Sequence, residues 1–145
     1  MNLYAGYVAT LAVLAISGVT DLRTRRFPHA LFCTLLLISS ISAVLFGGIE
    51  ALVRNACVSL LLASAVLVFE LLWRRFTRRS GQGMGDIKAL FALALFNPVV
   101  AGISYACAMI ALAGAGVALK QKALPLLPFF ATAYALVSIT ILFGM

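Results

Sequence analysis

The sequence predicts an all-α integral membrane protein, a bundle of about six transmembrane helices with a short fourth helix. Of the 145 residues, 64% are apolar and only 10% are charged, and the mean hydropathy is +1.14. These values exclude a soluble globular domain. The apolar residues also fall in runs near the roughly 20 residues that cross about 30 Å of hydrocarbon as a helix. Because no repeat, low-complexity tract or long linker interrupts the chain, we expect one membrane-embedded domain over residues 1–145.

Six apolar runs are predicted to form the helices. They cover residues 3–20, 30–46, 55–73, 87–96, 99–119 and 124–143. The first run is expected to remain as a helix, since a cleaved signal peptide carries its basic residues before the apolar run and here they follow it. The fourth run gives only about 15 Å of helix. One helix over 87–119 would reach about 50 Å, however, and Asn97-Pro98 offers a break between two helices.

The excess of 11 Lys and Arg over 4 Asp and Glu is explained by topology. With six spans, one side of the membrane carries ten of the cations and the other carries Arg54 alone. The positive-inside rule then places both termini outside and the three basic loops in the cytoplasm. A surface this apolar leaves no cationic face for nucleic acid, so the partner is the lipid bilayer. The ten cations on the cytoplasmic side are Arg23, Arg25, Arg26, Arg74, Arg75, Arg78, Arg79, Lys88, Lys120 and Lys122.

The three cysteines are predicted to be buried packing residues. Cys33, Cys57 and Cys107 lie singly in apolar runs, without a C-x-x-C spacing and with one His in the chain to join them. This arrangement disfavours a disulfide or a zinc site. We expect no metal and no cofactor.

Two of the four acidic residues have a simple structural explanation. Glu50 precedes Arg54 by four residues, and Glu70 precedes Arg74 by four, so each is predicted to form an i, i+4 pair at a membrane boundary. For Glu70, which lies in the last turns of its span, a role beyond pairing stays open.

Asp21 and Asp86 are the candidate functional residues. Asp21 ends the first span and Asp86 opens the fourth, so both lie at the same depth on the cytoplasmic side. An ionisable group there is costly unless it faces the bundle interior or water. Two structural alternatives stay open, pairing of Asp21 with a following Arg and an N-cap role for Asp86. The glycines at 81, 83 and 85 favour a site at Asp86, because they free the backbone for positive φ and for close approach of an extended peptide.

These motifs resemble the prepilin peptidases, intramembrane aspartic proteases that trim type IV pilin-like precursors. Gly83-Met84-Gly85-Asp86 followed by Ile87-Lys88 is similar to the family's G-x-G-D-[VI]-K. The run from Asp21 through Arg23 to Phe27-Pro28-His29 resembles its D-x-R-x-x-x-I-P-N pattern, and residues 124–129 resemble the proline-containing start of its last span. The likeness covers nearly the whole chain in order. Phe27 and His29 replace the usual Ile and Asn, so the second span is expected to be capped differently, with His29 a surface or capping residue.

The resemblance implies a catalytic pair, Asp21 and Asp86, in a membrane-embedded aspartic peptidase. The loop after Asp21 has no room for the cysteine-containing insertion of larger members, which carry an N-methyltransferase activity, so the chain resembles the short, peptidase-only form of tight-adherence (Flp-type) pilus systems. The implied substrate is a prepilin or pseudopilin precursor with a short basic leader, cut after a Gly at the cytoplasmic face of the bacterial inner membrane. The supporting motif residues are Gly83, Gly85, Lys88, Arg23 and Pro28.

Two carboxylates that share a water cannot comfortably both ionise, so one is expected to act as base and the other as acid. The pair titrates as a unit, so the sequence does not assign the proton. Arg23 and Lys88 are predicted to tune or orient the pair. Serine or cysteine catalysis is disfavoured because His29 has no acidic partner visible in the sequence. The alternatives are a small ion- or proton-coupled transporter subunit and a non-catalytic pilus assembly component. The oligomeric state stays open.

Overall fold

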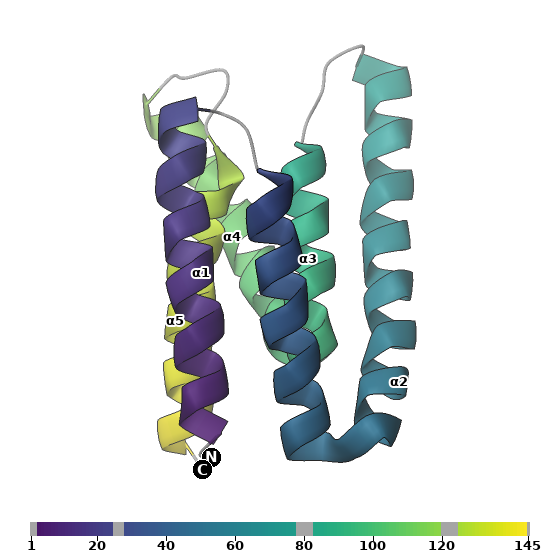
Figure 1. Ribbon diagram of the computed structural model, residues 1–145. Coiled ribbons are helices and arrows are strands. Elements are labelled where there is room, and N and C mark those ends of the chain that lie inside the picture. Colours follow the sequence, from purple (N-terminus) through teal and green to yellow (C-terminus); the bar gives the residue numbers. More distant parts are fainter. Residues whose placement is uncertain (1–2, 25–27, 78–82, 120–124, 145) are drawn as a thin grey trace.

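The computed structural model describes residues 3–24, 28–77, 83–119 and 125–144, and every regular element in these ranges is a helix. The helices run up and down in an antiparallel bundle, with the N- and C-terminal ends together at its lower end (Figure 1). The predicted all-α class is confirmed for the described residues. The helices are α1 (Leu3–Thr24), α2 (His29–Thr77), α3 (Met84–Phe96), α4 (Pro98–Leu119) and α5 (Leu126–Gly144).

Helix α2 is a hairpin of two helical arms that meet at Gly48. Gly48 has φ 75 and ψ −179, a conformation essentially restricted to glycine, and the chain reverses its direction there (Figure 1). A Cβ at the neighbouring Gly47 would overlap the Cβ of Ala51. The arms are about 28 Å and about 43 Å long. The glycine pair therefore allows the 49-residue α2 to fold back on itself.

The prediction of six separate spanning helices is wrong in its count. The second and third predicted segments are the two arms of α2, and they meet at the kink at Gly48 without the loop that was expected over residues 47–54. Two helices are long and apolar enough to cross a bilayer by length and composition, over residues 29–76 and 98–116. Shorter apolar stretches lie in α1 and α5. The predicted short fourth helix is confirmed as α3, which ends at Phe96, one residue before the expected break.

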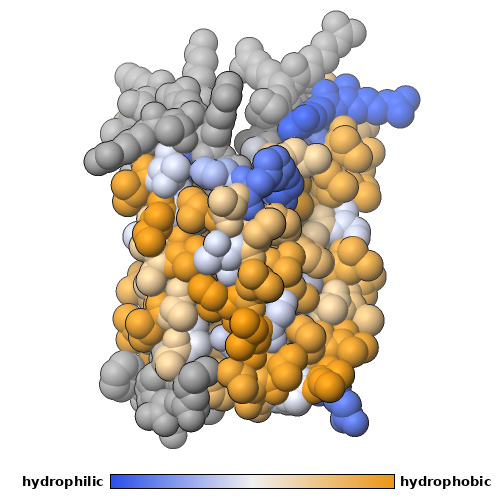
Figure 2. Space-filling view, in the orientation of Figure 1, coloured by the Kyte–Doolittle hydropathy of each residue, from blue (hydrophilic) through white to orange (hydrophobic). Residues whose placement is uncertain are grey.

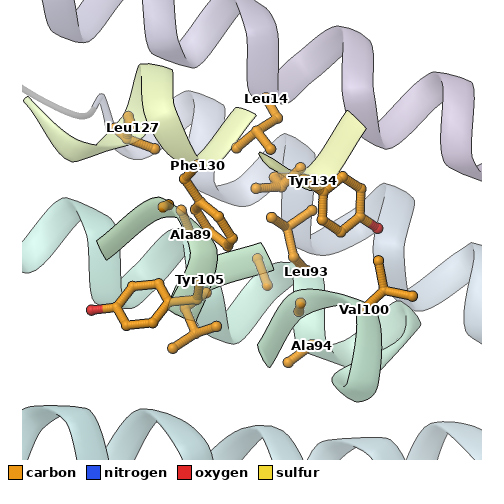
Figure 3. Packing of buried hydrophobic residues seen from close by; sticks show 14 of the residues in the cluster. Leu14, Ala89, Leu93, Ala94, Val100, Tyr105, Leu127, Phe130 and Tyr134 are labelled. Atoms are coloured by element: carbon orange, nitrogen blue, oxygen red, sulfur yellow. The ribbon is translucent and has the colours of Figure 1, made fainter. Parts of the chain in front are cut away.

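Helix α3 forms the centre of the bundle. It packs against both arms of α2 and against α4, and its side chains from Ala89 to Phe96 are almost all buried. Alanines at 89, 92 and 94 keep the helix narrow, which lets neighbouring helices approach closely. Figure 3 shows Leu93 of α3 in one cluster with Leu14 of α1 and Phe130 of α5. Because α3 is central, Asp86 in its first turn lies among several helices.

The described surface is apolar while part of the interior is polar. Figure 2 shows an apolar body with hydrophilic atoms gathered at its upper end and a small group at the lower end. Large apolar side chains are exposed on all helices except the central part of α3, whereas Thr10, Ser17, Ser39, Ser59 and Ser138 are fully buried. This inversion is expected where lipid surrounds the helices, because outward side chains then need no protein partner.

The three cysteines are exposed rather than buried, so that prediction is wrong. The physical reason is that apolar side chains lie on the outside of this bundle and polar side chains lie inside it. In a bundle surrounded by lipid, an apolar side chain does not need to enter the protein core to avoid water. The thiols of Cys33, Cys57 and Cys107 are free.

Both ends of the break between α3 and α4 are satisfied by asparagine side chains. Asn55, on the second arm of α2, donates from Nδ2 to the carbonyls of Leu95 at 3.1 Å and Phe96 at 3.0 Å. Asn97 accepts at Oδ1 from the N–H groups of Val99 and Val100, both at 3.2 Å, and so caps α4. A helix end has unpaired backbone groups that are costly away from water. The two asparagines therefore allow a short helix to end inside the bundle.

Candidate active site

Asp86 lies in the first turn of α3, where its carboxylate caps its own helix. Gly83 is the N-cap residue, and its backbone N–H donates to Oδ2 of Asp86 at 3.2 Å. The Asp86 N–H donates in turn to the Gly83 carbonyl at 3.1 Å. The alternative in which Asp86 is itself the N-cap residue is wrong, because Asp86 is the third residue of the helix. A carboxylate here is favoured by the free N–H groups and by the helix dipole.

The glycines before Asp86 provide space rather than positive φ. Gly83 is extended, with φ −79 and ψ 144, and Gly85 is helical. Gly81 lies outside the described residues. A Cβ added to Gly83 would lie 3.3 Å from Oδ2 of Asp86, closer than most real Cβ contacts. The small residue at position 83 therefore lets the backbone approach the carboxylate, and the expected positive φ is not found at Gly83 or Gly85.

Asp21 lies in the last turns of α1, on the face directed into the bundle. Buried side chains of α1 recur at Tyr7, Thr10, Leu14 and Ser17, and Asp21 continues this spacing of three and four residues. Its side chain is half-buried. Helix α1 continues to Thr24, so the carboxylate belongs to the helix rather than to the following loop. The inner face of α1 therefore directs Asp21 toward the interior.

The two aspartates interact electrostatically. Asp86 precedes the apolar run 87–96 and is 7% exposed. Its burial raises the pKa of the carboxyl from 3.8 to about 7, the hydrogen bond from the Gly83 N–H lowers this pKa, and the negative charge of Asp21 raises it. At neutral pH, Asp86 therefore holds its proton in a large fraction of molecules. The arrangement offers a buried carboxyl with a raised pKa that feels the charge of a second carboxylate.

Of the predicted supporting residues, Lys88 and Pro28 have other contacts. Lys88 places Nζ 5.9 Å from the ring centroid of Phe32 on α2, a cation–π contact, and pairs with neither aspartate in the described part of the chain. The carbonyl of Pro28 accepts the N–H of Phe32 at 3.2 Å and so begins α2. His29 is exposed at the first position of that helix, as expected for a surface residue. The side chain of Arg23 lies outside the described residues.

Glu70 forms the predicted pair, and Glu50 does not. Oε1 of Glu70 lies 2.6 Å from Nε of Arg74, and Glu70 is only 2% exposed. Glu50 and Arg54 are both exposed, and among the described contacts they form no ion pair. That prediction is wrong, because exposed charges gain little from pairing. Within the described ranges, no three His, Cys, Asp or Glu side chains gather where they could hold a metal ion.

Sequence reasoning missed Asn55, and it noted Asn97 only as a helix break. A single asparagine at the margin of an apolar run was the available signal, since a polar side chain there usually has a partner. The partner carbonyls lie some 40 residues away in the chain, so no local pattern could name them.

The described fold and site define a helical membrane protein with two coupled carboxylates at one end of its bundle. The chain belongs to the type IV leader peptidase family, whose sequence model matches residues 8–144. Searches of curated proteins and of solved structures give no significant match. The resemblance to the prepilin peptidases is thereby confirmed, and membership in this family supports a prepilin-type leader peptidase.

Proposed function

We propose that this protein is an aspartic endopeptidase in which Asp21 and Asp86 together activate water. The observation that carries this proposal is the coupling of the two carboxylates, which come from different helices and of which one is buried and raised in pKa to about 7. Structural carboxylates at helix ends have no need of such coupling, whereas paired acid and base groups require it. One domain over residues 1–145 would hold the whole site.

In this mechanism Asp21 is the base and Asp86 the acid. Ionised Asp21 takes a proton from water as the water oxygen attacks the carbonyl carbon of the scissile peptide. Protonated Asp86 donates a hydrogen bond to the developing oxyanion. The carbon–nitrogen bond then breaks, and the leaving amine takes the proton that Asp21 received from water, which leaves Asp21 ionised again and gives a new carboxylate and a new N-terminus. Burial supports this assignment, because the more buried carboxyl keeps its proton more readily.

In the proposed topology the chain passes along the bundle six times, in α1, the two arms of α2, α3, α4 and α5, and the 13-residue α3 is too short to cross a bilayer by itself. Arg74 and Arg75 lie in the last turn of α2, and Lys88 lies two residues after Asp86 in α3, whereas Arg54 lies six residues after the kink at Gly48. Figure 1 shows the end of α2, the start of α3 and the end of α1 at the upper end of the bundle, and the kink of α2 at the lower end. Under the positive-inside rule, the aspartates face the cytoplasm and both termini lie outside, in a bacterial inner membrane.

The proposed substrate is a Flp-type prepilin or a related pseudopilin. Its short basic leader would lie at the cytoplasmic face, and its apolar helix would lie in the bilayer beside the bundle. Helix α3 begins well short of the upper end of the second arm of α2 (Figure 1). The substrate segment at Asp86 would be extended, because cleavage needs the peptide backbone rather than a helix at the site.

Co-expression with a Flp-type prepilin tests the proposed function. The native chain is expected to convert the precursor to a faster-migrating form, with cleavage after a Gly confirmed by mass spectrometry. Asp21→Asn and Asp86→Asn are each expected to lower cleavage by about 10³-fold or more, because the two groups act as a unit. Glu50→Gln is the matched control, since Glu50 is exposed and lies next to the kink at the far end of the bundle.

All variants must be equally abundant in the membrane. Cleavage that persists in either aspartate variant would remove that residue from the chemistry. No cleavage by the native chain would favour the transporter or assembly alternatives, in which the carboxylates bind ions or only stabilise the fold.

Gly83→Ala is expected to lower kcat roughly tenfold without loss of folded protein. The added Cβ would displace the Asp86 carboxylate by a few tenths of an ångström, and small misplacements of reacting groups are costly. The backbone of Gly83 is allowed for alanine, so the fold should not suffer. The control is Gly102→Ala, whose Cβ would make an ordinary 3.9 Å contact with Leu62. Equal kcat in the two variants would contradict a role for space at Gly83.

A further inference from the structure

Asn97 joins three helices at the end of the bundle opposite the aspartates. While its Oδ1 caps α4, its Nδ2 donates to the hydroxyl of Tyr7 on α1 at 3.0 Å. Asn97 also ends α3, since its N–H donates to the carbonyl of Leu93 at 3.2 Å. One side chain thus connects the helix that carries Asp21 with the helix that carries Asp86.

The ring of Tyr7 adds a second contact at the same place. Tyr7 is buried, and its ring centroid lies 4.7 Å from that of Phe96, the last residue of α3. Elsewhere α1 packs mainly against α5 and α2, and Leu14 of α1 lies in one apolar cluster with Leu93 of α3. The hydrogen bond at Tyr7 therefore adds a directional contact to the apolar packing between α1 and α3.

Both aspartates lie far along their helices from this link. Asp21 is about 21 Å from Tyr7 along α1, and Asp86 is about 16 Å from Asn97 along α3. At such a distance, a tilt of about 3° at the link would move a carboxylate by about 1 Å, and a misplacement of about 1 Å can cost on the order of 10²-fold in rate.

We propose that Tyr7 is a positioning residue, whose hydrogen bond with Asn97 sets the angle between α1 and α3 and so the separation of Asp21 and Asp86. This inference rests on the proposed function for its catalytic consequence. Its structural part, the separation of the two helix ends, stands independently. Tyr7 acts through the two helices and touches neither the substrate nor the reacting atoms.

Removal of one hydroxyl tests the catalytic consequence. Tyr7→Phe keeps the ring on Phe96 and deletes the hydrogen bond, so kcat for prepilin cleavage should fall about tenfold while KM stays within about twofold. Tyr134→Phe is the matched control. Its ring centroid lies 6.5 Å from that of Tyr7 in the same core, but it belongs to α5 and its hydroxyl does not join α1 to α3. Native kcat in Tyr7→Phe, or an equal fall in both variants, would overturn the proposal.

A distance measurement tests the structural part whether or not the protein cleaves prepilin. Val19 and Met84 each precede an aspartate by two residues, and they are 52% and 58% exposed. Nitroxide labels at these positions, in a chain whose three exposed cysteines are replaced by serine, report the separation of the helix ends by pulsed electron paramagnetic resonance. Tyr7→Phe should broaden or shift the distance distribution, whereas Tyr134→Phe should not. An unchanged distribution in Tyr7→Phe would overturn the proposal even with an inactive protein.

Discussion

Prepilin cleavage is expected to slow about tenfold for each pH unit above about 7. In the proposed mechanism Asp86 must be protonated, and its pKa is raised to about 7, first by burial and then by the charge of Asp21. Above that pH the fraction of protonated Asp86 falls tenfold per unit. Because the two groups interact, the measured value belongs to the pair as its upper apparent pKa. Single-turnover cleavage by the purified protein from pH 5 to pH 9 measures this fall in the rate constant.

Thermal unfolding provides an independent readout of the same group. Between about pH 4 and pH 7 the unfolded chain has lost this proton while the folded chain keeps it, so folding stability falls as pH rises through that window and levels off above it. Asp86→Asn cannot ionise, so it should lack this fall and unfold several degrees higher than the native chain at pH 7. Two results would contradict the assignment of the proton to Asp86. One is a cleavage rate constant of the native chain that does not fall between pH 7 and pH 9, and the other is an equal pH dependence of unfolding in the native chain and Asp86→Asn.

Gly48→Ala is expected to cost roughly 1–3 kcal/mol of folding stability. Gly48 has φ 75 and ψ −179, and a side chain there is strained although the surrounding space is open. The turn joins the two arms of α2, so its loss would release the second arm and, with it, the Asn55 contact that satisfies the end of α3. Lower membrane abundance and a lower Tm should result, and cleavage should fall with the amount of folded protein.

Gly114→Ala is a control that differs in one variable. A Cβ at Gly114 also meets open space, but Gly114 lies within α4 without a positive φ. Alanine should therefore stabilise the helix by about 0.5–1 kcal/mol. Opposite shifts in Tm for the two substitutions would isolate the backbone strain at Gly48. A Tm for Gly48→Ala at or above that of the native chain would show that the turn tolerates a different conformation.

The sequence predicted the helical segments because lipid imposes a length and a polarity that can be counted along the chain. It also made Asp21 and Asp86 the candidate site residues, because an ionisable group beside an apolar run is costly unless it faces the bundle interior or water. Besides the helix count and the backbone conformation before Asp86, the predictions that failed concern the surroundings of a residue. The cysteines were expected inside the bundle, and Glu50 was expected to pair with Arg54. Spacing along a helix shows which side chains are neighbours, but it does not show whether they face lipid, water or protein.

The chain by itself thus determined the class of fold and, through its motifs, the family, and it proposed the two carboxylates as the site. Only the tertiary structure decided that Gly48 turns one helix into a hairpin and that Asp86 caps its own helix. It alone also joined Asn97 to Tyr7, 90 residues away. The physical reason is that apolar length and local spacing are properties of a single segment. Burial, hydrogen bonds between helices and the pKa of a carboxyl depend on which segments pack together.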